Sequence, residues 1–157
     1  RWSNGEPVTA RDFEFGLRRS CDPATLNEYS SILYPILNAE AVNAGEMPTD
    51  ALGVRVIDDK TLEFTLAQPT PYFLDALAHY TAYPLPRHVV EEFGDDWIQP
   101  ENIVGNGPYS IVEWIPNSYI RAVKSETYHD AANVSATSAF ASAQTAPPKP
   151  APNAVAA

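Results

Sequence analysis

The sequence predicts an α+β fold in which short helices and local β-hairpins share one chain. Three observations predict it: a helix with a well-marked start near residue 10, alternation of apolar and polar residues within 54–67, and a second alternating stretch in 109–124. Alternation with a period of two is typical of half-buried strands. Because both strand pairs are close in sequence, each is expected to form an antiparallel hairpin.

The first helix is predicted from Ala10 to Cys21. Thr9 is a suitable N-cap, and Asp12 lies three residues later, where its carboxylate completes a short capping box. Asp22-Pro23 is expected to end the helix, because the residue before a proline resists helical geometry.

Four further helices are predicted from apolar spacing and from glycine and proline punctuation. They cover residues 26–38, with Pro35 bending or dividing the helix, and then 39–44, 72–80 and 87–93.

The strands of the first hairpin lie within 54–67, and Asp58-Asp59-Lys60 supplies its polar turn. The strands of the second hairpin are 109–115 and 119–124, joined by Pro116-Asn117. Residues 135–157 are rich in Ala and Pro and are predicted to be a disordered tail, since such a segment buries too little apolar area to offset its ordering entropy.

Composition excludes several classes of protein. The net charge is -10, from 20 acidic and 10 basic residues, which disfavours binding to nucleic acid. No apolar stretch approaches the roughly 20 residues that span a bilayer. The single cysteine, Cys21, cannot form an internal disulfide and is expected to be buried and inert. The chain opens at Arg1 in mid-motif, so we expect an internal piece of a longer protein.

No catalytic or metal-binding pattern is present. His79, His88 and His129 are far apart in sequence, and none pairs with another at metal-ligand spacing. Asp58-Asp59 is expected to be a solvated hairpin turn, and Asp95-Asp96 a loop, so neither is a catalytic dyad. The sequence predicts no catalytic residue, no metal and no cofactor.

One aromatic residue stands out as a candidate for ligand binding. Tyr29 lies in the polar context Asn27-Glu28-Tyr29-Ser30-Ser31, where core packing does not explain it. Tyrosine offers a ligand a flat apolar face and a polar hydroxyl.

A likeness to a known family runs from residue 1 to about 134, with good agreement at 2–13, 22–23, 30–34, 38–45, 52–54, 58–63, 69–73, 93–97 and 102–109. In this order, these segments resemble the family 5 extracellular solute-binding proteins, and within them the oligopeptide binders. Ser125-Glu126-Thr127 departs from the family pattern, and no likeness is expected after Val134.

The resemblance implies an α+β portion of the α/β two-lobed periplasmic-binding-protein fold, of the class with an extra small domain. Residues 1–103 are expected to form part of the small domain beside the first lobe, and 104–134 the start of the return into that lobe. By its place in the motif, Tyr29 matches a tyrosine that reaches the ligand. Residues that select the ligand lie mostly outside this chain.

The resemblance also implies a function: the extracytoplasmic substrate-binding component of an ABC importer, which binds short oligopeptides and delivers them to a membrane permease. A monomer is expected, in the periplasm or lipid-anchored on the outer face of the cytoplasmic membrane. Alternatives are a receptor of the same family for a dipeptide, a cell-wall peptide, a nickel chelate or haem; a truncated non-functional fragment; and, remotely, a hydrolase.

Overall fold

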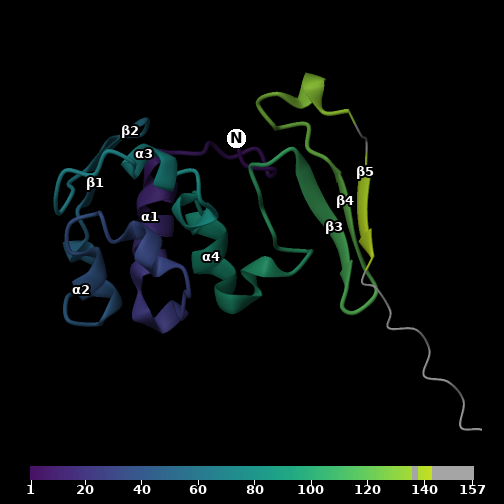
Figure 1. Cartoon of the computed structure of the whole chain (residues 1–157). Helices are drawn as coiled ribbons and strands as arrows, with labels where there is room; N and C mark the ends of the chain where they lie inside the picture. The colour runs from purple at the N-terminus through teal and green to yellow at the C-terminus, as the bar shows by residue number, and fades with distance from the viewer. Residues whose placement is uncertain (136–137, 143–157) are drawn as a thin grey trace, which may run out of the picture.

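A computed structural model of the chain describes residues 1–135 and 138–142, and Figure 1 shows their arrangement. A helical body contains every α-helix and the first hairpin, and a separate three-stranded sheet follows it. The body holds α1 (Ala10–Cys21), α2 (Ala39–Asn43), β1 (Val54–Asp58), β2 (Thr61–Phe64), α3 (Phe73–Ala76) and α4 (Arg87–Phe93). The sheet holds β3 (Tyr109–Ile115), β4 (Tyr119–Lys124) and β5 (Ser138–Ser142).

Helix α1 has the predicted bounds and start. The backbone N–H of Thr9 donates to the Asp12 carboxylate at 2.7 Å, which is the expected half of the capping box. The first helical N–H, that of Ala10, donates to the carbonyl of Asp59 at 2.8 Å. The hairpin turn therefore satisfies one of the free N–H groups at the start of α1.

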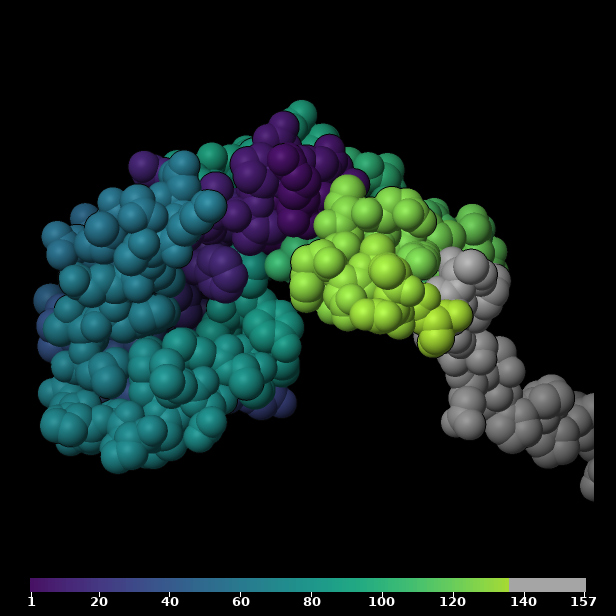
Figure 2. Space-filling model, turned by 90° about the horizontal axis from the view of Figure 1, so that it is seen from above, coloured from purple at the N-terminus to yellow at the C-terminus, as the bar shows by residue number. Residues whose placement is uncertain are grey.

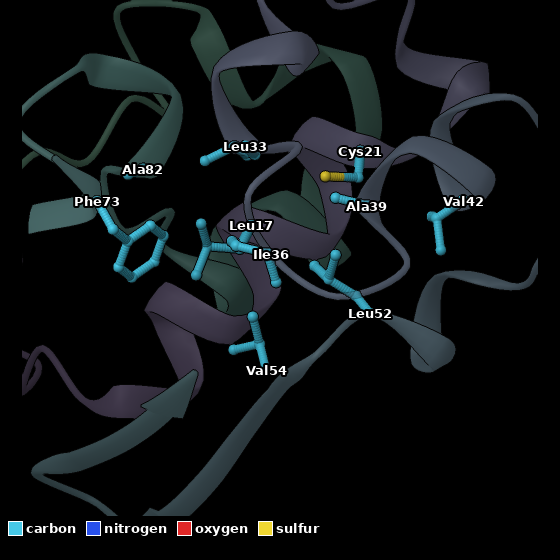
Figure 3. Close-up of a cluster of buried hydrophobic side chains, with 10 residues drawn as sticks. All are labelled: Leu17, Cys21, Leu33, Ile36, Ala39, Val42, Leu52, Val54, Phe73 and Ala82. Atoms are coloured by element: carbon cyan, nitrogen blue, oxygen red, sulfur yellow. The ribbon is translucent and has the colours of Figure 1, made fainter. Parts of the chain in front are cut away.

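The hydrophobic core gathers around α1. Leu17 and Cys21 on its inner face are buried together with Leu33, Ile36 and Val54. Figure 3 shows these side chains converging from α1, the segment after it and the first hairpin, with Phe73 and Ala82 at one side. Burying a large aliphatic side chain stabilises a fold by about 1.5–3 kcal/mol, so this cluster is the main source of the body's stability.

The helix predicted for residues 26–38 is wrong. Leu26 adopts a left-handed conformation (φ 51°), only Ser30–Leu33 forms a short 3-10 turn (η2), and Ile36 forms an isolated bridge with Leu66. Two effects explain this. Asn27 and Ser30 use their side chains to bind nearby backbone, which competes with helix formation, and Pro35 cannot donate to a helical ladder.

The first hairpin is as predicted. Its strands are antiparallel, with Val54 opposite Phe64 and Val56 opposite Leu62, and the register shifts between Val56 and Asp58.

Two short helices flank this hairpin in sequence. The predicted helix 39–44 is present as α2. Next to the hairpin, the helix predicted for 72–80 is reduced to the four residues of α3.

Helix α4 is also as predicted. Pro86 precedes it, where its missing N–H costs no hydrogen bond. Gly94 ends it with φ 57°, a conformation that favours glycine. A 3-10 turn, Gly94–Ile98 (η5), follows in the region predicted to be a loop.

The second hairpin, β3–β4, is confirmed, and its turn places Asn117 at φ 61°. The tail contains a departure from the prediction: Ser138–Ser142 forms β5, which pairs antiparallel with β4. Pairing through the backbone needs no large side chains, so small residues can extend a sheet that is already formed. The rest of the predicted tail, 136–137 and 143–157, lies outside the described residues.

The N-terminal residues lie at the junction of the body and the sheet. Ser3 N–H donates to the Gly105 carbonyl at 2.8 Å, and Gly105 N–H donates to Ser3 Oγ at 3.3 Å. Figure 2 shows the purple N-terminal residues between the teal body and the yellow-green side of the sheet. Within residues 1–135 and 138–142, no helix has the length and hydropathy required to span a membrane.

Candidate functional site

Tyr29 lies on the surface of the body, directly before η2. Its side chain is 48% exposed, and its backbone N–H donates to Asn27 Oδ1 at 3.1 Å. The ring is therefore available to a ligand while its backbone is held in a side-chain turn.

Tyr29 packs against two aromatic rings from a distant part of the chain. Its ring centroid is 5.6 Å from that of His79 and 5.7 Å from that of Tyr80, the latter in an edge-to-face arrangement. The His79 and Tyr80 centroids are 4.1 Å apart. We call these three residues the Tyr29 cluster. Tyr80 is 56% exposed, so the cluster presents aromatic surface to solvent.

The last turn of α1 anchors both loops that carry the cluster. The Ser20 carbonyl accepts hydrogen bonds from Asn27 Nδ2 at 3.1 Å and from Ser30 Oγ at 2.8 Å. Ser20 Oγ donates to the Thr81 carbonyl at 3.0 Å. One residue of a helix thus holds the loop of Tyr29 and the turn that contains Tyr80 and Thr81 (η4, Tyr80–Ala82).

Within the cluster, the surroundings of Tyr80 favour the protonated form of its hydroxyl. Partial desolvation raises the pKa of Tyr80 above its ordinary value, and the neighbouring Tyr29 and the charge of Glu28 raise it further. The Tyr80 hydroxyl therefore stays protonated at neutral pH and can donate a hydrogen bond. Aromatic faces beside a carboxylate suit aromatic or cationic groups of a ligand.

A second feature is an apolar groove of about 450 Å³ between the start of α1, the first hairpin and Leu77, which directly follows α3. Its lining includes Phe13, Leu62 and Phe64, and Lys60 is at the hairpin turn. Ala82, in the turn that follows Tyr80, also lines it. This groove could not be predicted from the sequence, because its walls come from segments that meet only in the folded chain.

Cys21 and the two acidic pairs lie in well-defined surroundings. Cys21 is 0% exposed, and burial raises its pKa to about 11, so the thiol does not ionise at neutral pH. Asp58 accepts hydrogen bonds from Lys60 N–H and the Thr61 hydroxyl in the hairpin turn, and these bonds lower its pKa. Asp95-Asp96 lies in η5. The described residues contain no group of three potential metal ligands in reach of one ion.

The sequence singles out Tyr29 as a candidate for ligand binding, which stays a prediction, and it does not single out the two rings that pack on Tyr29, His79 and Tyr80. A usable signal was the run His79-Tyr80-Thr81, in which two flat rings precede a proline-rich stretch. Nothing in the sequence shows, however, that this run packs on Tyr29.

Comparison with known proteins places this geometry in a family. A family model described as bacterial extracellular solute-binding proteins, family 5, middle part, matches residues 1–146. The match extends past Val134, so the expectation that the likeness ends there is wrong.

Among curated proteins, two from Escherichia coli strain K12 are each 44% identical. One is the periplasmic oligopeptide-binding protein OppA, aligned over 130 residues, 82% of this chain and 24% of OppA. The other is YgiS, named as a probable deoxycholate-binding periplasmic protein, aligned over 133 residues, 83% of this chain and 25% of YgiS. The chain spans about a quarter of the length of these relatives.

Among solved structures, Haemophilus influenzae OppA in complex with the peptide RPPGFSPFR aligns with a TM-score of 0.86 at 39% identity. The alignment covers 89% of this chain and 28% of that protein. The likeness confirms the predicted fold, an α+β portion of the two-lobed binding-protein architecture.

Proposed function

The chain belongs to the family 5 bacterial extracellular solute-binding proteins, and from this premise we propose that it is part of the extracytoplasmic substrate-binding component of an ABC importer for short oligopeptides. Its role is to bind the peptide without chemical change. The partners are the peptide and a membrane permease, and the protein acts as a monomer in the periplasm or anchored by lipid to the outer face of the cytoplasmic membrane.

One observation carries this proposal. The backbone superimposes over 89% of the chain, with a TM-score of 0.86, on a binding protein whose structure holds a peptide. The Tyr29 cluster lies in a loop and a turn, and loops are where binding residues concentrate. Family membership alone would not identify the ligand.

The residues we propose to meet the peptide are those of the Tyr29 cluster. The exposed faces of Tyr29 and Tyr80 stack on ligand side chains, and their hydroxyl groups form hydrogen bonds. Glu28 is exposed beside them and favours ligands with a positive charge. This arrangement tolerates many side chains, because stacking on a flat ring depends little on ligand sequence.

The role of the chain's domains follows the same proposal. Residues 1–103 form part of the small domain beside the first lobe, and residues 104–134 begin the return into that lobe. Figure 1 shows the helical body joined to the sheet through the segment between η5 and β3, which contains residue 103.

The relative YgiS, which is named for deoxycholate, provides a second candidate class of ligand. Deoxycholate is an anion with a large apolar body. The net charge of -10 and the exposed Glu28 oppose an anion, whereas a peptide brings an ammonium group and amide hydrogen bonds. We therefore favour peptides over a bile salt.

The test uses a chimera, because the chain spans only part of its relatives' length. Residues 1–134 replace the aligned segment of Escherichia coli OppA, and calorimetry measures binding of short peptides and of deoxycholate to the folded chimera. We expect it to bind peptides and not deoxycholate. The same chimera with Tyr29→Ala should bind peptides more weakly, and unmodified OppA serves as the control.

A chimera that melts cooperatively yet binds no peptide would overturn the proposal. Binding of deoxycholate in place of peptides would show that the ligand belongs to the second class, the bile salts. Equal peptide affinity with and without Tyr29 would remove Tyr29 from the site while leaving the peptide-binding function intact.

A further inference from the structure

The His79 ring is held on one edge by Thr81. The backbone N–H of Thr81 donates to His79 Nδ1 at 3.4 Å, and Thr81 Oγ1 lies 3.2 Å from the same nitrogen. Thr81 is 4% exposed, so this edge of the ring is turned toward the body. Within the part of the chain that the structure describes, His79 Nε2 makes no hydrogen bond.

These contacts fix the position of the ring proton. A backbone N–H can only donate, so the nitrogen that it meets must be an acceptor. In a neutral imidazole one nitrogen accepts and the other carries the proton. Since Nδ1 accepts, the proton is on Nε2, which lies on the ring edge away from Thr81.

We propose that Thr81 is a positioning residue that holds His79 as the Nε2–H tautomer, so that His79 donates a hydrogen bond to an oxygen of the ligand at the Tyr29 cluster. The inference rests on the proposed function for its ligand, a peptide whose backbone carbonyls are the matching acceptors. The tautomer of His79 is a property of the free protein and does not depend on the ligand.

Three further contacts restrict rotation of the ring. Ser20 Oγ donates to the Thr81 carbonyl at 3.0 Å and ties Thr81 to α1. The rings of Tyr29 and Tyr80 pack on His79 with centroid distances of 5.6 Å and 4.1 Å. A ring flip would carry Nδ1 away from Thr81 and break its hydrogen bonds, so the donor direction is set before a ligand arrives. Preorganisation of this kind increases affinity by lowering the ordering cost of binding.

The experiment is nitrogen NMR of the 157-residue chain labelled with ¹⁵N in histidine, at a pH where His79 is neutral. We expect the His79 resonances of the Nε2–H tautomer, with Nδ1 at the position of an unprotonated nitrogen. Thr81→Val keeps the side-chain volume and removes the hydroxyl, so only the 3.4 Å backbone contact remains on Nδ1, and a fraction of the Nδ1–H tautomer should appear. Thr81→Ser, which restores the hydroxyl, should return the wild-type pattern.

The matched control is Thr70→Val, which removes a hydroxyl bonded to the Gln68 carbonyl and should leave His79 unchanged. Titration of the Escherichia coli OppA chimera with a short peptide then measures affinity, and Thr81→Val in the chimera should weaken it about fivefold, as expected for one misplaced hydrogen bond. Wild-type His79 in the Nδ1–H form would overturn the inference even if Thr81→Val failed to fold. Equal peptide affinity with and without the Thr81 hydroxyl would remove the donor role and leave the proposed function intact, whereas a folded chimera that binds no peptide would count against the proposed function.

Discussion

At Gly16, helix α1 passes so close to the turn after η4 that no side chain fits. A Cβ atom at this position would lie 2.7 Å from the Tyr83 carbonyl oxygen and 3.4 Å from the Leu85 backbone nitrogen. Both are backbone atoms, which cannot move aside as a flexible side chain can. The glycine therefore sets the spacing between α1 and the segment that carries His79 and Tyr80.

Gly16→Ala tests this spacing. Alanine gains about 1 kcal/mol in helix propensity over glycine, whereas overpacking a close contact costs about 1–3 kcal/mol. Because the clash is with backbone, we expect the cost to prevail and the free energy of unfolding to fall, as measured by chemical denaturation. Gly107→Ala is the control, since a Cβ there meets nothing within 4 Å. A more stable Gly16→Ala protein would show that the turn yields easily.

At the scale of single residues, the sequence could predict a candidate but not a site. Tyr29 stood out because polar neighbours left its ring without a packing role. Its neighbours His79 and Tyr80 could not be chosen, because they reach Tyr29 only through the anchoring of two loops at Ser20. Side-chain hydrogen bonds between distant segments leave no periodic pattern in a sequence.

At the scale of elements, the β3–β4 hairpin contains a charge network that responds to acid. Glu113 accepts hydrogen bonds from the Tyr119 hydroxyl at 2.7 Å and from Arg121 Nε at 3.1 Å. These two contacts, in that order, lower the pKa of Glu113 from its ordinary 4.5. A lowered pKa means that the carboxylate stabilises the folded hairpin above about pH 4.5, and that this contribution is lost as pH falls through the folded pKa.

We therefore expect Glu113→Gln to remove part of the acid sensitivity of the hairpin. The measurement is the indole NMR signal of Trp114, the next residue in β3, followed through a pH titration below neutrality. Glu63→Gln, which breaks the Arg55–Glu63 ion pair of the other hairpin, should leave that signal's pH response unchanged. An identical acid transition in wild type and Glu113→Gln would show that the network contributes nothing.

Elements whose signals are local were predicted well. Helix α1, helix α4 and both hairpins follow from caps, alternation and turn residues that lie within a few positions of one another. The segment 26–38 has helical apolar spacing, but side-chain bonds and Pro35 direct it into turns and a bridge to Leu66. Strand β5 could not be predicted from its own sequence. Its position depends on pairing with the free edge of β4.

At the scale of the whole molecule, the two parts differ in how their apolar surface is covered. The buried hydrophobic cluster lies in the helical body, whereas no residue of β3 or β4 is fully buried. A small sheet needs a covered hydrophobic face for independent stability. The chain corresponds to about a quarter of the length of its relatives, and we propose that it supplies one wall of the peptide site.

The most direct test of this account is an NMR titration of the 157-residue chain with a millimolar pool of short peptides. We predict weak, saturable shifts concentrated on Tyr29, His79 and Tyr80, because the cluster is already formed in the free chain. Shifts confined to the apolar groove of Phe13 and Phe64, or no saturable shift at any residue, would contradict the claim that the Tyr29 cluster is the peptide-binding face.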